Sequence, residues 1–400
     1  MSRLDELIAE LCPNGVEYKN LGEIASITRG GSLQKKDFCE EGIPCIHYGQ
    51  IYTRYGLFTD KALTYISEDT AKRQKMAVKN DIIMAVTSEN IEDVCKCVVW
   101  LGDESVAVSG HTAIIHHNQN EKYLAYYLHS SHFFAQKVKL AHGTKVIEVT
   151  PDKLNNVSIP VPPLPVQQEI VRILDSFTEL TAELTAELTA RKRQYEYYRK
   201  SLLSFGPQVT WGILGGLGKV SMCKRIMKNE TSAEGDVPFY KIGTFGKKPD
   251  AYITREKYEE YKTKYSYPKK GDILISAAGT IGRAVIFDGE PSYFQDSNIV
   301  WLANDETKVL NSFLYYWYQT NPWKVATGGT IARLYNDNIA GAKVPLLSID
   351  EQKRIVNALN KLNTICTDFT SGLPAEIAAR QRQYEYYRDK LLTFQELKVE

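Results

Sequence analysis

The stretch RKRQYEYYRKSLLSF (Arg191–Phe205) occurs a second time as RQRQYEYYRDKLLTF (Arg380–Phe394), with 11 of 15 positions identical. Upstream, QQEIVRIL (Gln167–Leu174) is matched by QKRIVNAL (Gln352–Leu359), and each follows a proline-containing apolar run. Similar segments in the same order indicate an internal duplication. The chain is therefore predicted to consist of two copies that begin and end alike.

Weaker similarity connects the regions that precede the two helical repeats. The matched pairs are NGVEYKNLGEIASI (Asn14–Ile27) with PQVTWGILGGLGKV (Pro207–Val220), IPCIHYGQI (Ile43–Ile51) with VPFYKIGTF (Val237–Phe245), NDIIMA (Asn80–Ala85) with GDILIS (Gly271–Ser276), and GTKVIEVTPDKL (Gly143–Leu154) with GTIARLYNDNI (Gly329–Ile339). Each copy is thus one globular module followed by one helical module. We predict globular segments over 1–160 and 206–345, and helical segments over 161–205 and 346–400.

Both globular segments contain short runs rich in β-branched and aromatic residues, separated by Gly, Pro and Asn. This pattern is typical of strands. Helices are expected among them over Glu121–Val138 and around Phe313–Thr320. The predicted fold class is α+β, with two repeated, mainly-β globular modules separated by two long antiparallel coiled-coil helices.

The composition is that of a folded globular protein. Hydrophobic residues make up 43% and charged residues 24% of the chain, near the averages for such proteins. No apolar run approaches the roughly 20 residues of a membrane-spanning helix, and the charged N-terminus is unlike a secretion signal. Seven cysteines, an odd number, suit a reducing compartment better than a disulfide framework. We expect a cytoplasmic protein.

A metal site is not expected. Cys95 and Cys97 form the only close cysteine pair, and no second Cys or His pair completes a zinc set. His111, His116 and His117 have no Cys or acidic residue at ligand spacing beside them. Buried free thiols and structural histidines are the interpretation we adopt.

In both helical segments apolar or aromatic residues recur at steps of three and four, the pattern of a coiled-coil seam. The first segment contains the repeat TAELTAEL (Thr181–Leu188), which adds an extra four-residue step. The second seam runs through Ile365, Phe369 and Leu373. There Pro374 predicts a kink or short break, with the proline in the first turn of the continuing helix.

The helices have the length of spacers. A continuous helix from about Val166 to Ser204 would span about 58 Å, and two packed antiparallel would hold the globular modules about one DNA turn apart, roughly 34 Å. One more TAEL unit would add about 6 Å and rotate the downstream part of the chain by about 40°. Repeat number is therefore predicted to act as a ruler. The alternative is that these are ordinary core helices and the repeat is a neutral expansion.

The motif QYEYYR is richer in aromatic and arginine side chains than a buried seam requires, and such residues are enriched in interface hot spots. Because the helices are nearly identical while the globular modules diverge, we infer that they present one surface to two identical partners. The partner-binding candidates are Gln194, Tyr195, Tyr198, Arg199, Gln383, Tyr384, Tyr387 and Arg388. The alternative for Tyr195 and Tyr384 is packing inside the intramolecular seam.

Two diverged modules, each followed by a near-identical helix ending in QYEYYR and LLSF or LLTF, resemble the specificity subunits of type I restriction-modification enzymes across essentially the whole chain. The TAEL repeat and the openings NGVEYKNLGE and PQVTWGILGG strengthen the resemblance, although GILGG lacks the charged pair of KNLGE. The resemblance implies a circular pseudo-twofold symmetry, in which LLTF leads to NGVEY as LLSF leads to PQVTW. The two ends of the chain are then expected to lie near each other.

The resemblance also implies a DNA sequence-specificity subunit with no catalytic centre of its own. Two target recognition domains would each read one half of an asymmetric bipartite DNA site. The helices would set the gap between the halves and bind two methyltransferase subunits, and restriction translocase subunits would join that core. S-adenosylmethionine, ATP and magnesium are then expected on the partner subunits, with no cofactor on this chain.

The DNA-contacting candidates come from side-chain chemistry, because recognition domains vary in sequence. The net charge of +1 is small for a DNA reader, so positive charge must be local or supplied by a partner. Residues 224–270 hold 12 Lys or Arg against 7 Asp or Glu, although the EKYEEYKTK part fits a solvated helix face almost as well.

The second-module candidates lie in this segment and in the loops AAGTIGR (Ala277–Arg283), FQDSN (Phe294–Asn298) and GGTIAR (Gly328–Arg333). They are Lys224, Arg225, Lys228, Lys241, Lys247, Lys248, Thr280, Arg283, Gln295, Asn298 and Arg333. We expect Arg283 to reach guanine or phosphate. The first-module candidates are Lys35, Lys36, His47, Gln50, Arg54, Thr87, Ser88, Asn90 and Lys145.

Two other classes of protein are the alternatives. A self-contained endonuclease would use Pro249, Asp250, Glu260 and Lys262, which fit a loose PD and ExK pattern that a Lys-rich segment often matches by chance. No NPPF-like or DPPY-like tetrapeptide is present to hold a flipped base, and GILGGLG lacks the GxGxxG spacing. A stand-alone DNA-binding regulator would bind DNA tightly without a partner, whereas a near-neutral subunit would bind weakly alone.

Overall fold

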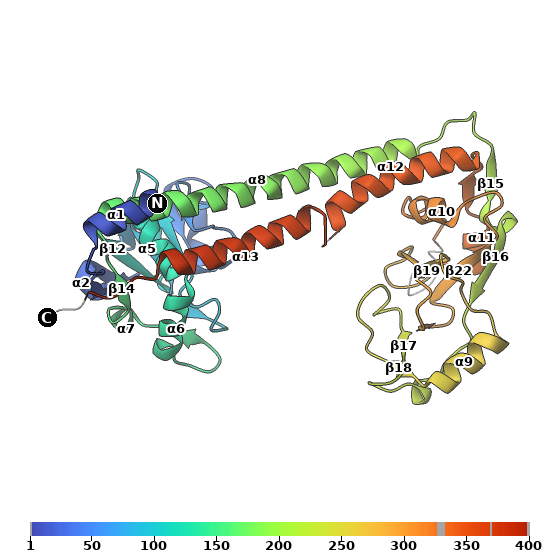
Figure 1. The fold of residues 1–400 in the computed structure, drawn as a ribbon, viewed down its shortest axis with the longest axis horizontal. Helices are drawn as coiled ribbons and strands as arrows, with labels where there is room; N and C mark the ends of the chain where they lie inside the picture. Colours follow the sequence, from blue (N-terminus) through green and yellow to red (C-terminus); the bar gives the residue numbers. More distant parts are fainter. Residues whose placement is uncertain (1, 326–332, 369, 398–400) are drawn as a thin grey trace. The chain divides into compact units, whose positions relative to one another are not determined.

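The computed structural model describes residues 2–325, 333–368 and 370–397, and the chain divides into two compact units. Unit 1 comprises Met1–Thr185 and Glu376–Glu400, and unit 2 comprises Ala186–Ala375. Each unit therefore contains one globular module, the end of one helical segment and the start of another (Figure 1).

Unit 1 is built on two five-stranded sheets and two short strand pairs. The first sheet has the order β2 (Ala25–Arg29), β12 (Thr112–His117), β8 (Ile82–Ala85), β10 (Cys97–Trp100), β5 (Phe58–Thr59). The second has the order β3 (Phe38–Cys39), β6 (Thr64–Ile66), β4 (Ile43–Ile46), β11 (Val106–Val108), β7 (Lys75–Ala77). The pairs are β1 (Tyr18–Asn20) with β14 (Ser158–Pro160) and β9 (Thr87–Ser88) with β13 (Ile147–Glu148).

The α-helices of unit 1 ahead of the long helix are mostly short. They are α1 (Arg3–Leu11), α2 (Leu21–Ile24), α3 (Tyr48–Thr53), α4 (Glu68–Ala71), α5 (Glu121–Leu128), α6 (Ser131–Leu140) and α7 (Pro151–Leu154). The predicted single helix over Glu121–Val138 is thus two helices. They separate because Ser130 caps the second one, its Oγ accepting a hydrogen bond from the Phe133 N–H at 3.3 Å.

Unit 2 repeats this plan with fewer strands. One sheet has the order β16 (Gly218–Met222), β22 (Ile299–Asn304), β19 (Ile273–Ser276), β20 (Ala284–Ile286), and the other the order β18 (Tyr252–Ile253), β17 (Val237–Tyr240), β21 (Tyr293–Phe294). In addition, β15 (Trp211–Ile213) forms an antiparallel pair with β23 (Lys343–Pro345). The helices are α9 (Arg255–Lys264), α10 (Asn311–Tyr318), α11 (Asn336–Ala340) and α12 (Ile349–Thr367).

The two units share one topology. The order β2-β12-β8-β10 corresponds to β16-β22-β19-β20, and all of these neighbours are antiparallel. In the second sheets, β4 pairs antiparallel with β6 and parallel with β11, as β17 pairs with β18 and β21. The structure therefore confirms the α+β class and the duplication of a strand-rich module.

The central strand of each unit is buried on both faces, because its alternate side chains enter two different cores. Ile82 and Met84 of β8 belong to the cluster that packs under the long helix, whereas Ile83 and Ala85 belong to a second cluster. In β19, Ile273 and Ile275 enter one core and the intervening leucine enters the other. This arrangement explains why NDIIMA and GDILIS are almost continuously apolar.

A buried glutamine anchors a helix to the globular part of each unit. Gln167 of the long helix α8 (Leu164–Leu202) accepts a hydrogen bond from the Asn120 N–H at 3.0 Å. Gln352 of α12 accepts one from the Leu310 N–H at 2.8 Å. Both amides also donate to the backbone carbonyl five residues earlier, and both side chains are fully buried. The duplication thus extends to individual buried hydrogen bonds.

α8 is continuous over 39 residues, close to the predicted span, and begins in unit 1 and ends in unit 2. The second helical segment is broken as predicted: α12 ends at Thr367 and α13 (Leu373–Leu391) begins with Pro374 in its first turn. In the break, hydrogen bonds from the hydroxyls of Ser371 and Thr370 lower the pKa of Asp368. The predicted seam residue Phe369 lies outside the described residues.

Segments near the two ends of the chain meet in unit 1. The Val16 N–H donates to the Gln395 carbonyl at 2.8 Å, and the Leu397 N–H donates to the Val16 carbonyl at 2.9 Å. In unit 2 the corresponding helix end, LLSF, is joined to the next module through the peptide backbone. In unit 1, hydrogen bonds therefore join the end of the second helical segment to the start of the first module. In unit 2 the peptide chain itself makes the corresponding connection, as the circular symmetry predicts.

The capping residue at the C-terminal end of α5 differs from its counterpart on α10. In unit 1 it is His129, largely buried, with Nδ1 2.9 Å from the Ala125 carbonyl oxygen. In unit 2 it is Gln319, which accepts a hydrogen bond from Arg199 at 2.9 Å. Burial, with the nearby positive charge of Arg388, lowers the pKa of His129 to about 4.

This pKa predicts a pH-dependent stability of unit 1. Because the folded pKa lies below the unfolded value of 6.5, the unfolded chain binds the proton first, and stability falls as the pH decreases from about 6.5 toward 4. Between pH 7 and 4 the wild type should lose roughly 3 kcal/mol more than the His129→Gln variant. Urea unfolding, with hydrogen exchange of α5 as the local readout, measures the difference. Equal pH dependence of the two proteins would contradict this assignment.

Candidate nucleic-acid interface

Two loops form the same hydrogen-bonded frame in both units. The first loop follows β4 in unit 1 and β17 in unit 2. The His47 N–H donates to Gln50 Oε1 at 2.9 Å, and the Lys241 N–H donates to Thr244 Oγ1 at 3.2 Å. The side chain three residues further on thus closes the turn in each unit, and the residue that leads the turn is His47 in one and Lys241 in the other.

The second loop follows β11 in unit 1 and β21 in unit 2 and caps the first. Its capping side chains are Ser109, which accepts from the Tyr48 N–H at 3.0 Å, and Gln295, which accepts from the Ile242 N–H at 2.9 Å. In unit 1 this loop ends at His111, whose carbonyl accepts a hydrogen bond from the N–H of Val86, the residue after β8. In unit 2 it ends at Asn298, whose carbonyl accepts one from the N–H of Ala277, the residue after β19. We call these two loops together the loop frame. The backbone N–H groups that these side chains bond lie at matching positions in the two units, while the side chains themselves differ.

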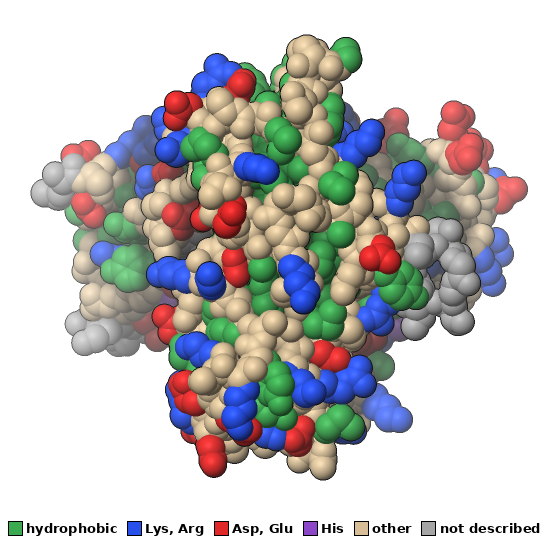
Figure 2. Space-filling view, turned by 90° about the vertical axis from the view of Figure 1, so that its right-hand side faces the viewer, with side chains coloured by type: hydrophobic (Ala, Val, Ile, Leu, Met, Phe, Trp, Pro, Cys, Tyr) green, Lys and Arg blue, Asp and Glu red, His purple; other side chains and the backbone are tan. Residues whose placement is uncertain are grey.

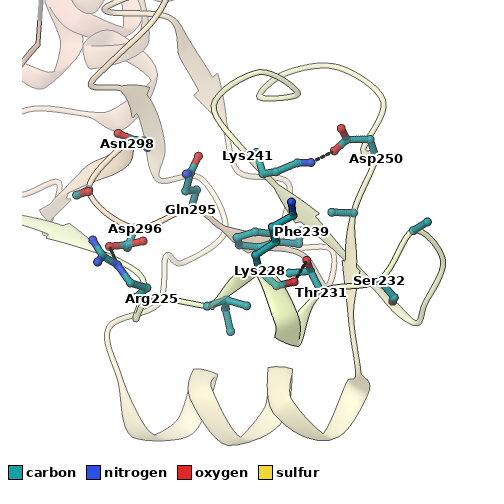
Figure 3. A pocket seen from close by; sticks show the side chains of 14 residues that line it. Arg225, Lys228, Thr231, Ser232, Phe239, Lys241, Asp250, Gln295, Asp296 and Asn298 are labelled. Carbon is teal, nitrogen blue, oxygen red and sulfur yellow. Dashed lines mark hydrogen bonds and ion pairs between the residues drawn. The ribbon is translucent and has the colours of Figure 1, made fainter. Parts of the chain in front are cut away.

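In unit 2 the loop frame borders an open pocket of about 540 Å³. Its polar lining includes Arg225, Lys228, Lys241, Asp250, Gln295, Asp296 and Asn298. Arg225 Nε lies 2.8 Å from Asp296 Oδ2, and Lys241 Nζ lies 2.9 Å from Asp250 Oδ1. Figure 3 shows Gln295 between these two ion pairs. With Lys228 added, three cations face two carboxylates, so the pocket carries an excess of positive charge.

Two amides of this pocket have free hydrogen-bonding capacity. Gln295 uses its Oε1 to hold the Ile242 N–H, and within the described part of the chain its Nε2 has no bonding partner. The Asn298 side chain also has none among the described residues. The sequence-predicted candidates Arg225, Lys228, Lys241, Gln295 and Asn298 are therefore brought together at one site.

The other second-module arginines support loops. Arg283 Nη1 donates to the Phe245 carbonyl at 2.8 Å, and Arg333 Nη2 donates to the Ser297 carbonyl at 2.6 Å. The expected reach of Arg283 toward DNA is therefore opposed by its bond to the Phe245 backbone, whereas Thr280 is exposed. Of the loop Gly328–Arg333, residues 328–332 lie outside the described residues.

The remaining basic candidates of unit 2 lie on its surface. Lys247 and Lys248 are exposed, and Lys224 Nζ lies 5.2 Å from the centre of the Tyr265 ring. On the face turned to the viewer in Figure 2, Lys and Arg side chains are interspersed with Asp and Glu. No single basic patch dominates that face, in keeping with the near-neutral net charge.

In unit 1 the loop frame carries a row of rings instead of amides. The ring of Tyr48 lies 4.5 Å from that of His47 and 4.9 Å from that of His111. His111 Nδ1 is 3.1 Å from Thr87 Oγ1, and the buried His47 has a lowered pKa because of burial. Tyr48 was not among the residues predicted from the sequence, and His111 was predicted to be structural only. The alignment of IPCIHYGQI with VPFYKIGTF could have pointed to Tyr48, because it places Tyr48 directly after His47, the counterpart of Lys241.

The other unit 1 candidates divide into engaged and exposed side chains. Gln50 holds the turn at His47, and the Asn90 amide bonds the Asp93 carboxylate at 2.8 Å. Ser88 Oγ accepts from the Asn90 N–H at 3.5 Å. The exposed candidates are Lys35, Lys36, Arg54 and Lys145.

The QYEYYR motif divides between internal packing and exposure. Tyr384 packs on the core of unit 1, 6.3 Å from Tyr126, and Tyr195 packs on the core of unit 2. These contacts favour an intramolecular role for both side chains, with the globular cores as their partners. Tyr387 stacks on Phe177 at 5.5 Å. Four other candidates, Gln194, Arg199, Gln383 and Arg388, are bonded within their own units.

The exposed members of the motif are partly different from those predicted. Tyr197 is 68% exposed and its counterpart Tyr386 is 62% exposed, whereas the predicted Tyr198 is 42% exposed. Tyr197 and Tyr386 were not among the predicted partner-binding residues. The signal was helical spacing: with the first tyrosine in the seam, the residue two positions later lies on another face.

The nuclease-like pattern does not form one cluster of free groups. Asp250 pairs with Lys241, Glu260 pairs with Lys264 at 3.0 Å, and Lys262 lies over the Tyr258 ring. In residues 2–325, 333–368 and 370–397 no group of three or more His, Cys, Asp or Glu is arranged to hold a metal ion. His116 does have an acidic partner, Asp81 at 2.6 Å, which the sequence spacing did not reveal.

None of the helices in the described part of the chain is long and apolar enough to cross a membrane. All seven cysteines are free, and six of them are buried. Burial raises the pKa of Cys95 and of Cys223 to about 12 in each case. These thiols are therefore protonated and unreactive near neutral pH.

Two copies of one fold, each with its own polar loop frame, define a duplicated recognition protein. The family model for the type I restriction modification DNA specificity domain matches the chain twice, over residues 13–191 and 209–379. The chain belongs to this family, which confirms the resemblance seen in its repeats.

A relative supports this assignment, and two solved structures share the fold. A putative type I restriction enzyme specificity subunit from Haemophilus influenzae is 45% identical over 388 residues, covering 95% of this chain and 96% of that protein. The HsdS subunit from Thermoanaerobacter tengcongensis has a similar fold, with a TM-score of 0.52 at 17% identity over 96% of this chain and 97% of that one. A structure described as explaining complex assembly and conformational transition of the type I R-M system gives a TM-score of 0.62 at 18% identity, over 95% and 98% of the chains.

Proposed function

We propose that the two units each read one half of an asymmetric bipartite DNA site, and that the chain itself performs no chemistry. The observation that carries the proposal is the loop frame, in which backbone N–H groups at matching positions are bonded in both units while the side chains differ. Two such surfaces on one chain suit two different half-sites. The excess positive charge beside the frame of unit 2 suits a polyanion.

The methyl transfer and the cleavage are then assigned to partners. Two methyltransferase subunits would bind the helices and carry S-adenosylmethionine, and restriction translocase subunits would join that core with ATP and magnesium. The near-neutral charge of the chain supports this division, because a protein with few excess cations gains little from phosphate contacts alone. Its free cysteines support a cytoplasmic location.

Tyr197 and Tyr386 are the residues we assign to the two methyltransferase contacts. They occupy equivalent positions, one in each unit, and each packs edge-on against the next tyrosine, at 5.6 Å in one case and 5.3 Å in the other. A large aromatic ring held by its neighbour but exposed to solvent is typical of an interface anchor.

Replacing Tyr197 and Tyr386 by alanine is expected to weaken capture of the methyltransferase by about tenfold or more for each site. The double variant should then bind site DNA, even with the methyltransferase present, as weakly as the chain alone. Fluorescence anisotropy on DNA carrying the methylated site, with and without the partner, measures both effects.

Phenylalanine at the same two positions is the matched control, because it keeps the ring and should bind the partner nearly as wild type does. Since both side chains are exposed, the alanine variants should unfold within about 0.5 kcal/mol of wild type. Tight, specific DNA binding by the chain alone would instead favour a stand-alone regulator.

The TAEL repeat is proposed as the ruler between the half-sites. The boundary between the two units, after Thr185, falls inside the repeat Thr181–Leu188, so the residues of α8 that flank this boundary on either side belong to the repeat. A change in repeat number therefore alters the link between the units while leaving each loop frame intact.

Deleting Thr185–Leu188 shortens α8 by about 6 Å and removes about 40° of rotation. The gap between the half-sites should change by one or a few base pairs, with both half-sites unchanged, as read from the methylation motif. Glu187→Gln is a control of unchanged length that loses only the exposed ion pair with Arg191. An unchanged gap after the deletion would favour the neutral-expansion alternative.

A further inference from the structure

In the loop frame the bonded backbone positions are shared between the units, whereas the side chains at those positions differ. This difference locates the specificity-determining residues. The side chains that hold the frame accept hydrogen bonds from backbone N–H groups. Gln50 and Thr244 close the first loop in this way, and Ser109 and Gln295 cap it. A side chain that varies at a fixed backbone position, and that keeps free polar atoms, is the kind that selects a base without altering the fold.

In unit 2 three side chains meet this description. The Lys241 ammonium is held at one rim by Asp250. The Gln295 amide is fixed by its Oε1, which leaves its Nε2 free among the described residues, and Asn298 ends the same loop (Figure 3). Ammonium and amide groups donate to purine N7 and O6, and an amide also pairs bidentately with adenine.

In unit 1 the same positions carry a different chemistry. His47 stands at the place of Lys241, Ser109 at that of Gln295, and His111 at that of Asn298. The Ser109 hydroxyl is buried and occupied by the Tyr48 N–H, so the accessible groups are the rings of Tyr48 and His111. A ring edge and an imidazole favour apolar contact and a single hydrogen bond over a bidentate amide contact.

We propose that Lys241, Gln295 and Asn298 read purine edges in the major groove of one half-site, and that Tyr48 and His111 read the other half-site from the matching place in unit 1. This inference rests on the proposed function and adds to it the residues and the class of base edge. Arg225 and Lys228, at the border of the same pocket, contact phosphates and do not select a base. Arg283 and Arg333 remain supports of the loops.

The geometry of the pocket favours this division of roles. The Gln295 amide cannot rotate freely, because its oxygen is committed to the Ile242 N–H, so its donor group points in one fixed direction. A preorganised donor discriminates between bases better than a flexible one, since it loses less entropy on binding. Arg225, in contrast, is 65% exposed at its side chain and is held by a single carboxylate.

The test uses the full chain with its methyltransferase and reads the methylation motif in DNA from cells expressing each variant. Asn298→Ala and Lys241→Ala should relax one or two positions of a single half-site, with preference for the original base reduced by about tenfold to a hundredfold. Gln295→Glu keeps the acceptor for the Ile242 N–H but replaces the donor by a carboxylate. It should shift the preference from a purine toward cytosine.

His111→Ala should relax only the other half-site, so the two sets of variants control for each other. Glu259→Ala changes an exposed residue of α9 that does not line the pocket, and it should leave the motif unchanged. Retention of the untouched half-site in each variant shows that the protein has folded and assembled with its partner.

Relaxation confined to the expected half-site would support the inference. Unchanged half-sites in Asn298→Ala, Lys241→Ala and Gln295→Glu, beside a bipartite wild-type motif, would overturn it while leaving the proposed function standing. A wild-type motif that is not bipartite would overturn the proposed function and this inference together.

Discussion

A buried side-chain amide in each unit is the interaction on which the rest of the structure depends. Gln167 and Gln352 are fully enclosed, and each bonds one backbone N–H at the start of a neighbouring helix and one carbonyl ahead of its own helix. A buried polar group left unpaired costs about 1–3 kcal/mol, so these amides tolerate only one orientation of helix and module. Further along the same helices, Tyr126 bonds Asp175 and Tyr316 bonds Asn360, each at 2.6 Å, and these pairs repeat the same constraint.

Because the helices are fixed in this way, the residues that stabilise each unit are different from the loop residues proposed to recognise DNA. The cores, the central strands β8 and β19 and the anchoring amides are matched between the units, whereas the loops they support carry rings in one unit and amides with a lysine in the other. A change in a loop side chain therefore costs little in the core. The modest charge of the chain fits the proposed function, in which the reading surfaces supply local donors and partners supply most of the phosphate contacts.

The sequence was sufficient to predict the features that depend on local pattern and on repetition. The duplication, the α+β class, the long first helix and the break at Pro374 all derive from identity between copies, apolar periodicity and the chemistry of proline. It did not reveal the break before Ser130, because a capping bond competes with a continuous helical pattern. It also missed the contact of Tyr48 with His111, which the parallel pairing of β4 with β11 creates between loops distant in the chain. Helical spacing places the first and second tyrosines of QYEYYR on different faces, but which of these faces is exposed depends on how the helix packs against its unit.

The central claim is that one chain presents two different reading surfaces on a shared frame. The most direct measurement is the pattern of modified bases in DNA from cells that express the chain with its methyltransferase, read by modification-sensitive sequencing. The account predicts two unlike half-sites separated by a fixed number of unspecified base pairs. A single uninterrupted motif, or two identical half-sites, would contradict it.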